Sequence, residues 1–203
     1  MKKMMLLGAL MMACTAAVGH AQESRQDVSV SLFGIYAPPV YGLEIHPMTT
    51  TSSGGILASY RYMLTPRSGV ELNYSYAQNS IKYNPASQPN SRVSEQLQEA
   101  TAAYVYTRTY KRYNPFLEGG VGAEIFTPIL DYGTSQLTIN QQMKIGGLFG
   151  GGLAYELSPS FDLRVEYRGF MTMAPDFGAL GGIFTTNRFY ILMTPSLGVA
   201  YHF

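Results

Sequence analysis

The histidines His46 and His202 are the first candidates for acid–base chemistry, because imidazole changes its charge near neutral pH. A third histidine, His20, belongs to the N-terminal leader described below. Serine hydrolases need a histidine held between a serine and an acid. Neither His46 nor His202 is followed by a serine two residues later, the arrangement we would expect in a deacylase. We therefore predict no catalytic residue and no enzyme activity.

Thiol and metal chemistry also lack the residues that they need. Cys14 is the only cysteine and lies in the leader, so the rest of the chain can form no disulfide, thiolate nucleophile or cysteine-ligated metal site. The two remaining histidines, Asp131 and Asp176 are scattered without the spacing of metal ligands. We predict that the protein holds neither a metal nor another cofactor.

The N-terminus has the pattern of a secretory signal peptide. Lys2 and Lys3 precede the apolar run Met4–Val18, which is too short to span a bilayer, and Ala21 supplies a small residue for cleavage. A lipoprotein signal using Cys14 is the alternative, but the residues before that cysteine fit such a site poorly. We predict a signal peptide over residues 1–21 and a single domain over residues 22–203.

Composition narrows the class of this domain. The chain has 14 basic and 13 acidic residues, and because Lys2 and Lys3 lie in the leader the domain is nearly neutral. No basic field or known motif favours nucleic acid. With 46% hydrophobic residues, 13% charged residues, 16 tyrosines and 21 glycines, but no long apolar run, the domain fits a soluble β-sandwich or a transmembrane β-barrel.

Eight segments alternate apolar and polar residues with the period of a β-strand. We predict strands at residues 27–36, 53–64, 70–80, 97–110, 116–126, 142–157, 161–171 and 189–203. The connections between them alternate long and short, as in outer-membrane barrels, which have short periplasmic turns and longer external loops. This pattern predicts an all-β fold, an eight-stranded antiparallel up-and-down transmembrane β-barrel. The facing of the fourth strand is ambiguous, because Tyr104, Tyr106 and Arg108 share one face.

Charged residues of the strands share a face with the small and polar residues, opposite the apolar row. In a barrel the apolar row would meet lipid and the charges would fill the lumen, where unpaired charges are costly. We therefore predict a lumenal charge network of Arg61, Glu71, Glu118, Glu124, Lys144, Glu156, Arg164, Glu166 and Arg168. Glycines on that face would make room for these long side chains. In this arrangement Glu166→Ala would leave Arg164 and Arg168 poorly compensated.

The last strand, Phe189–Phe203, ends on an aromatic residue and carries Pro195 within it, where we expect a bulge. Together with the runs Pro115–Gly122 and Leu163–Arg168, this ending resembles the OmpA/OmpX-type eight-stranded outer-membrane β-barrel family. The resemblance covers the whole domain. It implies that Tyr201 and Phe203 belong to a signal read by the barrel-assembly machinery.

The resemblance implies a protein of the bacterial outer membrane, in contact with its lipid, with a structural or surface-interaction role. An eight-stranded barrel is filled by side chains and has no wide pore. Apolar residues in the long loops, such as Tyr41 and Phe177, could form a surface for an unidentified extracellular ligand or pack on each other. The alternatives are a secreted lipocalin-like barrel that binds a small lipid and, less favoured, a lipid A-modifying barrel enzyme.

Overall fold

A computed structural model describes residues 25–41, 48–83, 91–129, 140–177 and 188–203. The predicted signal peptide and His46 lie outside these residues. No helix in the described part of the chain is both long and apolar enough to cross a membrane. The described residues form strands and the connections between them.

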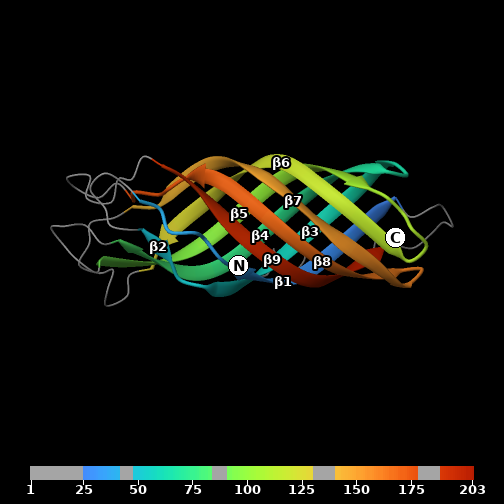
Figure 1. Cartoon of the computed structure of the whole chain (residues 1–203), viewed down its shortest axis with the longest axis horizontal. Coiled ribbons are helices and arrows are strands. Elements are labelled where there is room, and N and C mark those ends of the chain that lie inside the picture. The colour runs from blue at the N-terminus through green and yellow to red at the C-terminus, as the bar shows by residue number, and fades with distance from the viewer. Residues whose placement is uncertain (1–24, 42–47, 84–90, 130–139, 178–187) are drawn as a thin grey trace, which may run out of the picture.

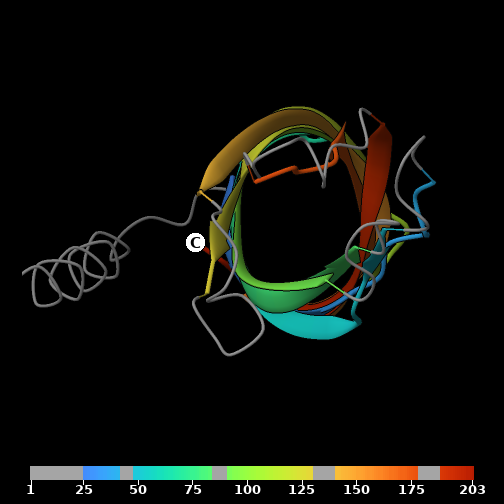
Figure 2. The same ribbon diagram turned by 90° about the vertical axis from the view of Figure 1, so that its left-hand side faces the viewer.

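The strands close into one antiparallel barrel, which Figures 1 and 2 show from the side and along its axis. They are β1 Gln26–Ile35, β2 Thr49–Thr50, β3 Ser53–Thr65, β4 Ser68–Tyr83, β5 Ser91–Thr107, β6 Tyr113–Pro128, β7 Gln142–Ser158, β8 Phe161–Met173 and β9 Phe189–His202. Around the barrel the order is β4-β3-β1-β9-β8-β7-β6-β5, and pairing of β4 with β5 closes the ring. The short β2 pairs only with the end of β4. This confirms the predicted eight-stranded, up-and-down barrel.

The ends of several strands differ from the prediction. Residues 81–93 were expected to be a loop, but β4 continues to Tyr83 and β5 begins at Ser91, so that the two strands pair along their whole length. The first long connection was also expected to lack strands, yet it contains β2. The prolines and the Asn, Ser and Gln residues of residues 81–93 are typical of a loop, and they concealed the strand ends on either side.

The facing of β5 is settled by where the strand ends. Tyr104 and Tyr106 are exposed, whereas Glu99 on the other face is buried. The strand stops at Thr107, so Arg108 lies in the following turn and does not break the apolar row. The arginine that made the pattern ambiguous is therefore not part of the strand.

No bulge forms at Pro195, contrary to expectation. The pairing of β9 with β8 runs through Tyr167 and Pro195 without a register shift. On the other side, pairing with β1 stops at Phe33 and Ser196 and resumes in the same register at the bridge between Tyr36 and Met193. Proline lacks an N–H group, so the ladder loses a hydrogen bond here without needing an extra residue.

The barrel interior is layered along its axis. At the end with the long connections, buried apolar side chains form a cluster that includes Phe33, Ile35, Leu97, Phe126 and Phe177. Phe177 lies after β8 and packs edge-on against Phe126, with ring centroids 6.4 Å apart. Of the two alternatives for Phe177, an exposed loop surface or packing against other residues, the structure shows packing, because this residue is buried inside the barrel. Charged side chains fill the layers below.

Candidate functional site

The charged interior is built by strand alternation, which turns every second side chain into the lumen. On β8 the outward residues Val165 and Tyr167 are exposed, while Arg164, Glu166 and Arg168 between them are buried. The same alternation turns Arg61 of β3, Glu71 of β4 and Glu118 of β6 inward. Charged groups from most of the barrel wall therefore meet in one confined space.

Arg164 is the node of the network nearest the short turns. Its Nη2 atom lies 2.8 Å from Asp27 Oδ1 on β1, and its Nη1 atom lies 3.5 Å from Glu71 Oε2 on β4. Arg61 on β3 shares the same Glu71 oxygen through Nε at 2.6 Å. The guanidinium groups of Arg61 and Arg164 also lie over the ring of Phe116, at 4.6 and 5.7 Å. Two arginines are thus held between acids and one aromatic ring.

Arg168 is the second node, and its side chain is 2% exposed. Its Nη2 atom donates to Glu99 Oε1 on β5 at 2.6 Å. Its Nε atom lies 3.5 Å from Glu118 Oε1 on β6 and 3.4 Å from Glu166 Oε1 on β8. One guanidinium group therefore compensates three buried carboxylates across the width of the barrel.

Three predicted members of the network lie inside the barrel but outside these ion pairs. Glu124 is fully buried, and the Tyr190 hydroxyl donates to it at 3.4 Å. Lys144 stands opposite Glu124 in the register, and Glu156 lies near the short turns, both half-buried. Among the described residues, none of the three forms an ion pair. Glu124 lies nearer the long connections and therefore does not reach Arg164 or Arg168.

Sequence reasoning missed four buried acids. Asp27, Glu95, Glu99 and Asp162 all point inward, and two of them hold the arginine nodes. Glu95 was missed because the fourth strand was predicted to begin only at residue 97, and Glu99 because that strand was given an ambiguous facing. The exposed pair of tyrosines on that strand would have shown it, since inward residues have the opposite parity.

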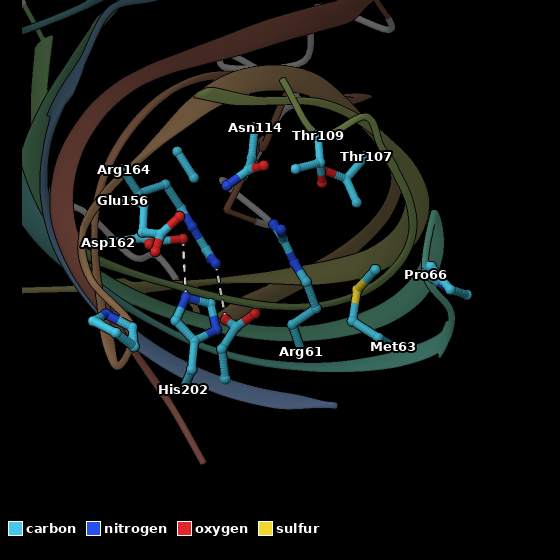
Figure 3. Close-up of a pocket in the computed structure, with 13 residues that line it drawn as sticks. Arg61, Met63, Pro66, Thr107, Thr109, Asn114, Glu156, Asp162, Arg164 and His202 are labelled. Atoms are coloured by element: carbon cyan, nitrogen blue, oxygen red, sulfur yellow. Dashed lines mark hydrogen bonds and ion pairs between the residues drawn. The ribbon is translucent and has the colours of Figure 1, made fainter. Parts of the chain in front are cut away.

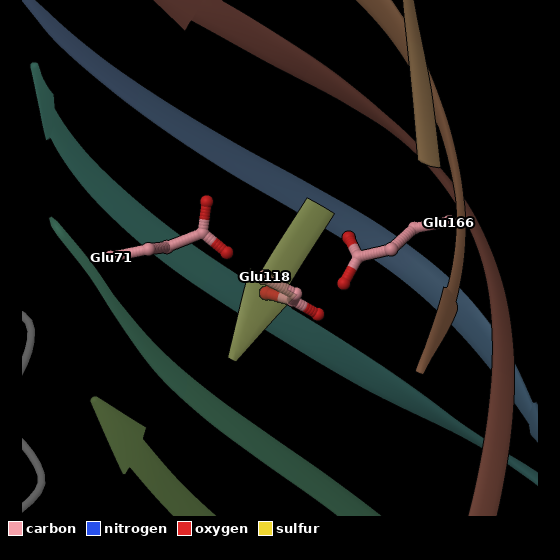
Figure 4. A group of neighbouring side chains, drawn as sticks. All are labelled: Glu71, Glu118 and Glu166. Atoms are coloured by element: carbon pink, nitrogen blue, oxygen red, sulfur yellow. The ribbon is translucent and has the colours of Figure 1, made fainter. Parts of the chain in front are cut away.

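Three carboxylates converge at the centre of the barrel, as Figure 4 shows. One oxygen each of Glu71, Glu118 and Glu166 lies within 4.8 Å of the others. Such a cluster could ligate a cation, but Arg61 and Arg164 already contact Glu71, and Arg168 contacts the other two. We therefore treat it as part of the ion-pair network and assign no metal to it.

Glycines on the inner face make room for neighbouring side chains, and these are mainly a glutamate and aromatic rings and not the arginines. A Cβ atom on Gly150 would lie 2.7 Å from Glu118 Oε1. On Gly152 and Gly146 it would lie 2.6 Å from the rings of Phe116 and Phe170. The prediction that these glycines accommodate long side chains applies to Glu118, while the other two accommodate aromatic rings.

We expect Gly150→Val to lower the free energy of unfolding by about 1–3 kcal/mol, as overpacking of a filled interior does. Gly119→Val is the matched control, because Gly119 faces outward and a Cβ atom there would meet nothing within 4 Å. Urea unfolding in lipid vesicles measures both. Equal stability of the two variants would show that the interior is not tightly filled.

A polar cavity of about 260 Å³ opens at the end of the barrel with the short turns. Figure 3 shows side chains from opposite walls, among them Arg61, Asn114 and Glu156, pointing into it. At its edge His202 Nε2 lies 2.9 Å from Asp162 Oδ2. Among the described residues, no serine hydroxyl is hydrogen-bonded to His202. The geometry of a serine hydrolase is therefore not present around this histidine.

The outer surface of the barrel is apolar and carries tyrosines. Their hydroxyl groups point away from the middle of the barrel, towards its two ends. Towards the short turns, the Tyr60 hydroxyl donates to Gln26 at 2.8 Å and the Tyr104 hydroxyl to Ser68 at 2.7 Å. Towards the long connections, the Tyr74 hydroxyl donates to Gln98 at 2.8 Å. Two interfacial rows of this kind flank the apolar band of a membrane barrel.

Tyr201 and Phe203 lie on the outer face where the barrel has its short turns. Tyr201 is exposed, its ring centroid lies 5.1 Å from that of Phe161, and it stacks on Phe203 at 6.1 Å. These aromatic side chains continue the interfacial row at that end.

A closed barrel that is apolar outside and charged inside is the architecture of a transmembrane β-barrel. A soluble lipocalin-like barrel would need the reverse, with an apolar interior for its lipid. The outer membrane protein beta-barrel domain family matches residues 5–203, and the chain belongs to this family. It is therefore an outer-membrane β-barrel.

Solved structures agree with this assignment. Neisserial surface protein A has 16% identity and a TM-score of 0.61, with 89% of this chain and 98% of that chain covered. OprG from Pseudomonas aeruginosa has 15% identity and a TM-score of 0.58, covering 90% and 97%. Ail of Yersinia pestis, solved with the heparin analogue sucrose octasulfate, has 16% identity and a TM-score of 0.54, covering 90% and 100%. At these low sequence identities, the similarity to the three solved structures concerns the fold alone. No curated protein matches the sequence.

Proposed function

We propose that the protein is a non-enzymatic structural or surface-interaction barrel that spans the outer membrane with its short turns in the periplasm. The observation that carries this proposal is the inversion of polarity, with exposed Leu72, Val121 and Leu197 outside and buried Arg164 and Arg168 inside. In water this arrangement would expose the apolar surface and bury the charges. In a bilayer both faces have the environment that they require.

The interior supports a barrel without a wide pore. The apolar cluster around Phe126 and Phe177 fills the end with the long connections, and the arginine nodes fill the middle. The polar cavity lies at the opposite end. Passage through the barrel would require both filled layers to move.

The role in surface interaction rests on the long connections, which in this orientation face the outside of the cell. Tyr36 and Tyr41 are exposed there, and they offer aromatic contact area to an extracellular ligand. The Yersinia barrel solved with a heparin analogue shows that a related fold can hold a ligand of that kind.

Export and assembly complete the proposal. Residues 1–21 would act as the signal peptide, and cleavage would leave a domain beginning at residue 22. Tyr201 and Phe203 would be read by the barrel-assembly machinery through the last strand. The exposed position of both aromatic side chains on the outer face is compatible with such contact.

A gel-mobility experiment tests the membrane barrel. Protein extracted in detergent from outer membranes should migrate differently before and after boiling, because a closed barrel resists unfolding by detergent alone. Recovery of the protein in the soluble periplasmic fraction, with one mobility, would contradict the proposal. Altered lipid A in cells that overexpress the protein would instead point to an enzyme.

A further inference from the structure

The end of the barrel with the short turns carries a group of exposed basic side chains. We call Arg25, Arg67, Arg108, Lys111 and Arg112 the basic arc; all five are exposed. They come from the start of β1, the turn between β3 and β4, and the turn between β5 and β6. Segments far apart in the sequence thus supply positive charge to the same end of the barrel.

Backbone hydrogen bonds show that these segments are contiguous. Met63 N donates to Arg25 O at 2.7 Å, which places Arg25 beside the end of β3. Thr107 N donates to Arg67 O at 2.8 Å, which joins one turn to the base of the next. Glu156 N donates to Arg112 O at 2.9 Å, so that the arc extends to the end of β7. The basic residues therefore follow one side of the rim.

The rest of this rim differs in character. The turn after β7 contains Pro159 between two serines, and the neighbouring strands carry the aromatic group of Phe161, Tyr201 and Phe203. Among the described residues, no basic side chain is exposed there. The charge is concentrated on one sector and is not spread evenly around the ring.

Acidic partners for the arc are turned away from it. Among the described residues, the acids at this end are Asp27, Glu156 and Asp162, and all three line the cavity inside the barrel. Asp27 is paired with Arg164, and Asp162 is paired with His202. Within the described residues, no member of the arc forms an ion pair. Five cations are therefore available to an external anion.

The position of the arc decides which anion it fits. Directly above it the exposed tyrosines Tyr62 and Tyr106 continue the outward rows of β3 and β5, and the Tyr104 hydroxyl donates towards Ser68 at the turn. Aromatic side chains of this kind lie at the level of lipid headgroups. The arc thus lies where the phosphate groups of a leaflet would be, and basic clusters next to a membrane attract anionic lipid.

We propose that the basic arc binds the phosphate groups of anionic phospholipids in the leaflet that meets the short turns. The bound lipids would fix the depth of the barrel and favour one sector of its rim. This inference rests on the membrane location proposed above and adds a lipid class and a binding sector to it.

Native mass spectrometry of the refolded full chain tests this proposal. The protein is released from bilayers that contain equal amounts of phosphatidylcholine and phosphatidylglycerol, and the retained lipids are counted. We expect phosphatidylglycerol to be retained with a preference of about tenfold over phosphatidylcholine at low salt, falling as ionic strength rises. The variant R67Q/R108Q/K111Q/R112Q should retain the two lipids almost equally.

The variant K82Q/R92Q/R188Q is the control, because it removes three exposed cations from the opposite end of the barrel. It should keep the wild-type preference. Loss of preference in both variants, or in neither, would overturn the assignment to the arc. Insertion of all three proteins into vesicles of phosphatidylcholine alone is measured in parallel, and failure of the wild type there would contradict the membrane barrel itself.

Discussion

Arg168→Met is expected to lower the free energy of unfolding by about 3–5 kcal/mol, the cost of removing one partner from a buried ion pair. Arg168 contacts Glu99, Glu118 and Glu166, and its side chain is 2% exposed. Methionine fills a similar volume without a charge. Three carboxylates would then lie close together in a confined space without their shared cation. Urea unfolding of the barrel refolded in lipid vesicles, followed by the change in gel mobility, measures the loss.

Glu166→Gln provides the first control, and here the structure revises the expectation from sequence. Removing Glu166 was expected to leave Arg164 and Arg168 poorly compensated. Arg164, however, contacts Asp27 and Glu71, and Arg168 keeps Glu99 and Glu118. Glutamine also removes one charge from an acidic cluster, so we expect a change below about 1 kcal/mol.

A double variant separates charge from packing. Combining Arg168→Met with Glu118→Gln should cost less than the sum of the single changes, because Glu118 no longer needs compensation. Lys144→Met is a further control, since Lys144 is half-buried and forms no ion pair among the described residues. If Arg168→Met and Lys144→Met had equally small effects, the interior network would not stabilise the barrel.

The barrel could be predicted from the sequence because its strands repeat with period two and its connections differ in length. Strand β8 shows this well, since Val165 and Tyr167 alternate with Arg164, Glu166 and Arg168 in both sequence and structure. Membership of a closed sheet follows from such patterns when every strand has one apolar face. The outward residues of the strands were therefore predictable, except on β5, where Arg108 made the facing ambiguous.

The pairing of charges inside the barrel could not be predicted in the same way. Alternation says which residues face inward, but the height of each charge depends on register and strand tilt. Glu124 and Glu118 lie on the same face of β6, yet only Glu118 reaches Arg168. Asp27 was overlooked because it stands at the start of β1, where a charge also suits solvent. Contacts across the lumen join residues that have no relation along the chain.

The outward placement of Leu72 predicts the second large effect, because this residue lies between the diverging tyrosine rows. Leu72 is 58% exposed and pairs with Tyr60, whose hydroxyl points to the short-turn end, while Tyr74 follows it towards the long connections. Leu72→Arg would place a charge near the middle of the bilayer. We expect the free energy of unfolding in vesicles to fall by about 2–4 kcal/mol.

Leu157→Arg is the matched control, because Leu157 is 57% exposed but lies at the end of β7 beside a short turn. An arginine there reaches the headgroup region, and the expected cost is about 0–1 kcal/mol. Since residue type and exposure are matched, the difference between the two variants measures depth in the membrane. Equal costs for both would mean that the two leucines share one environment, as they would in water, and would contradict a barrel that spans the bilayer.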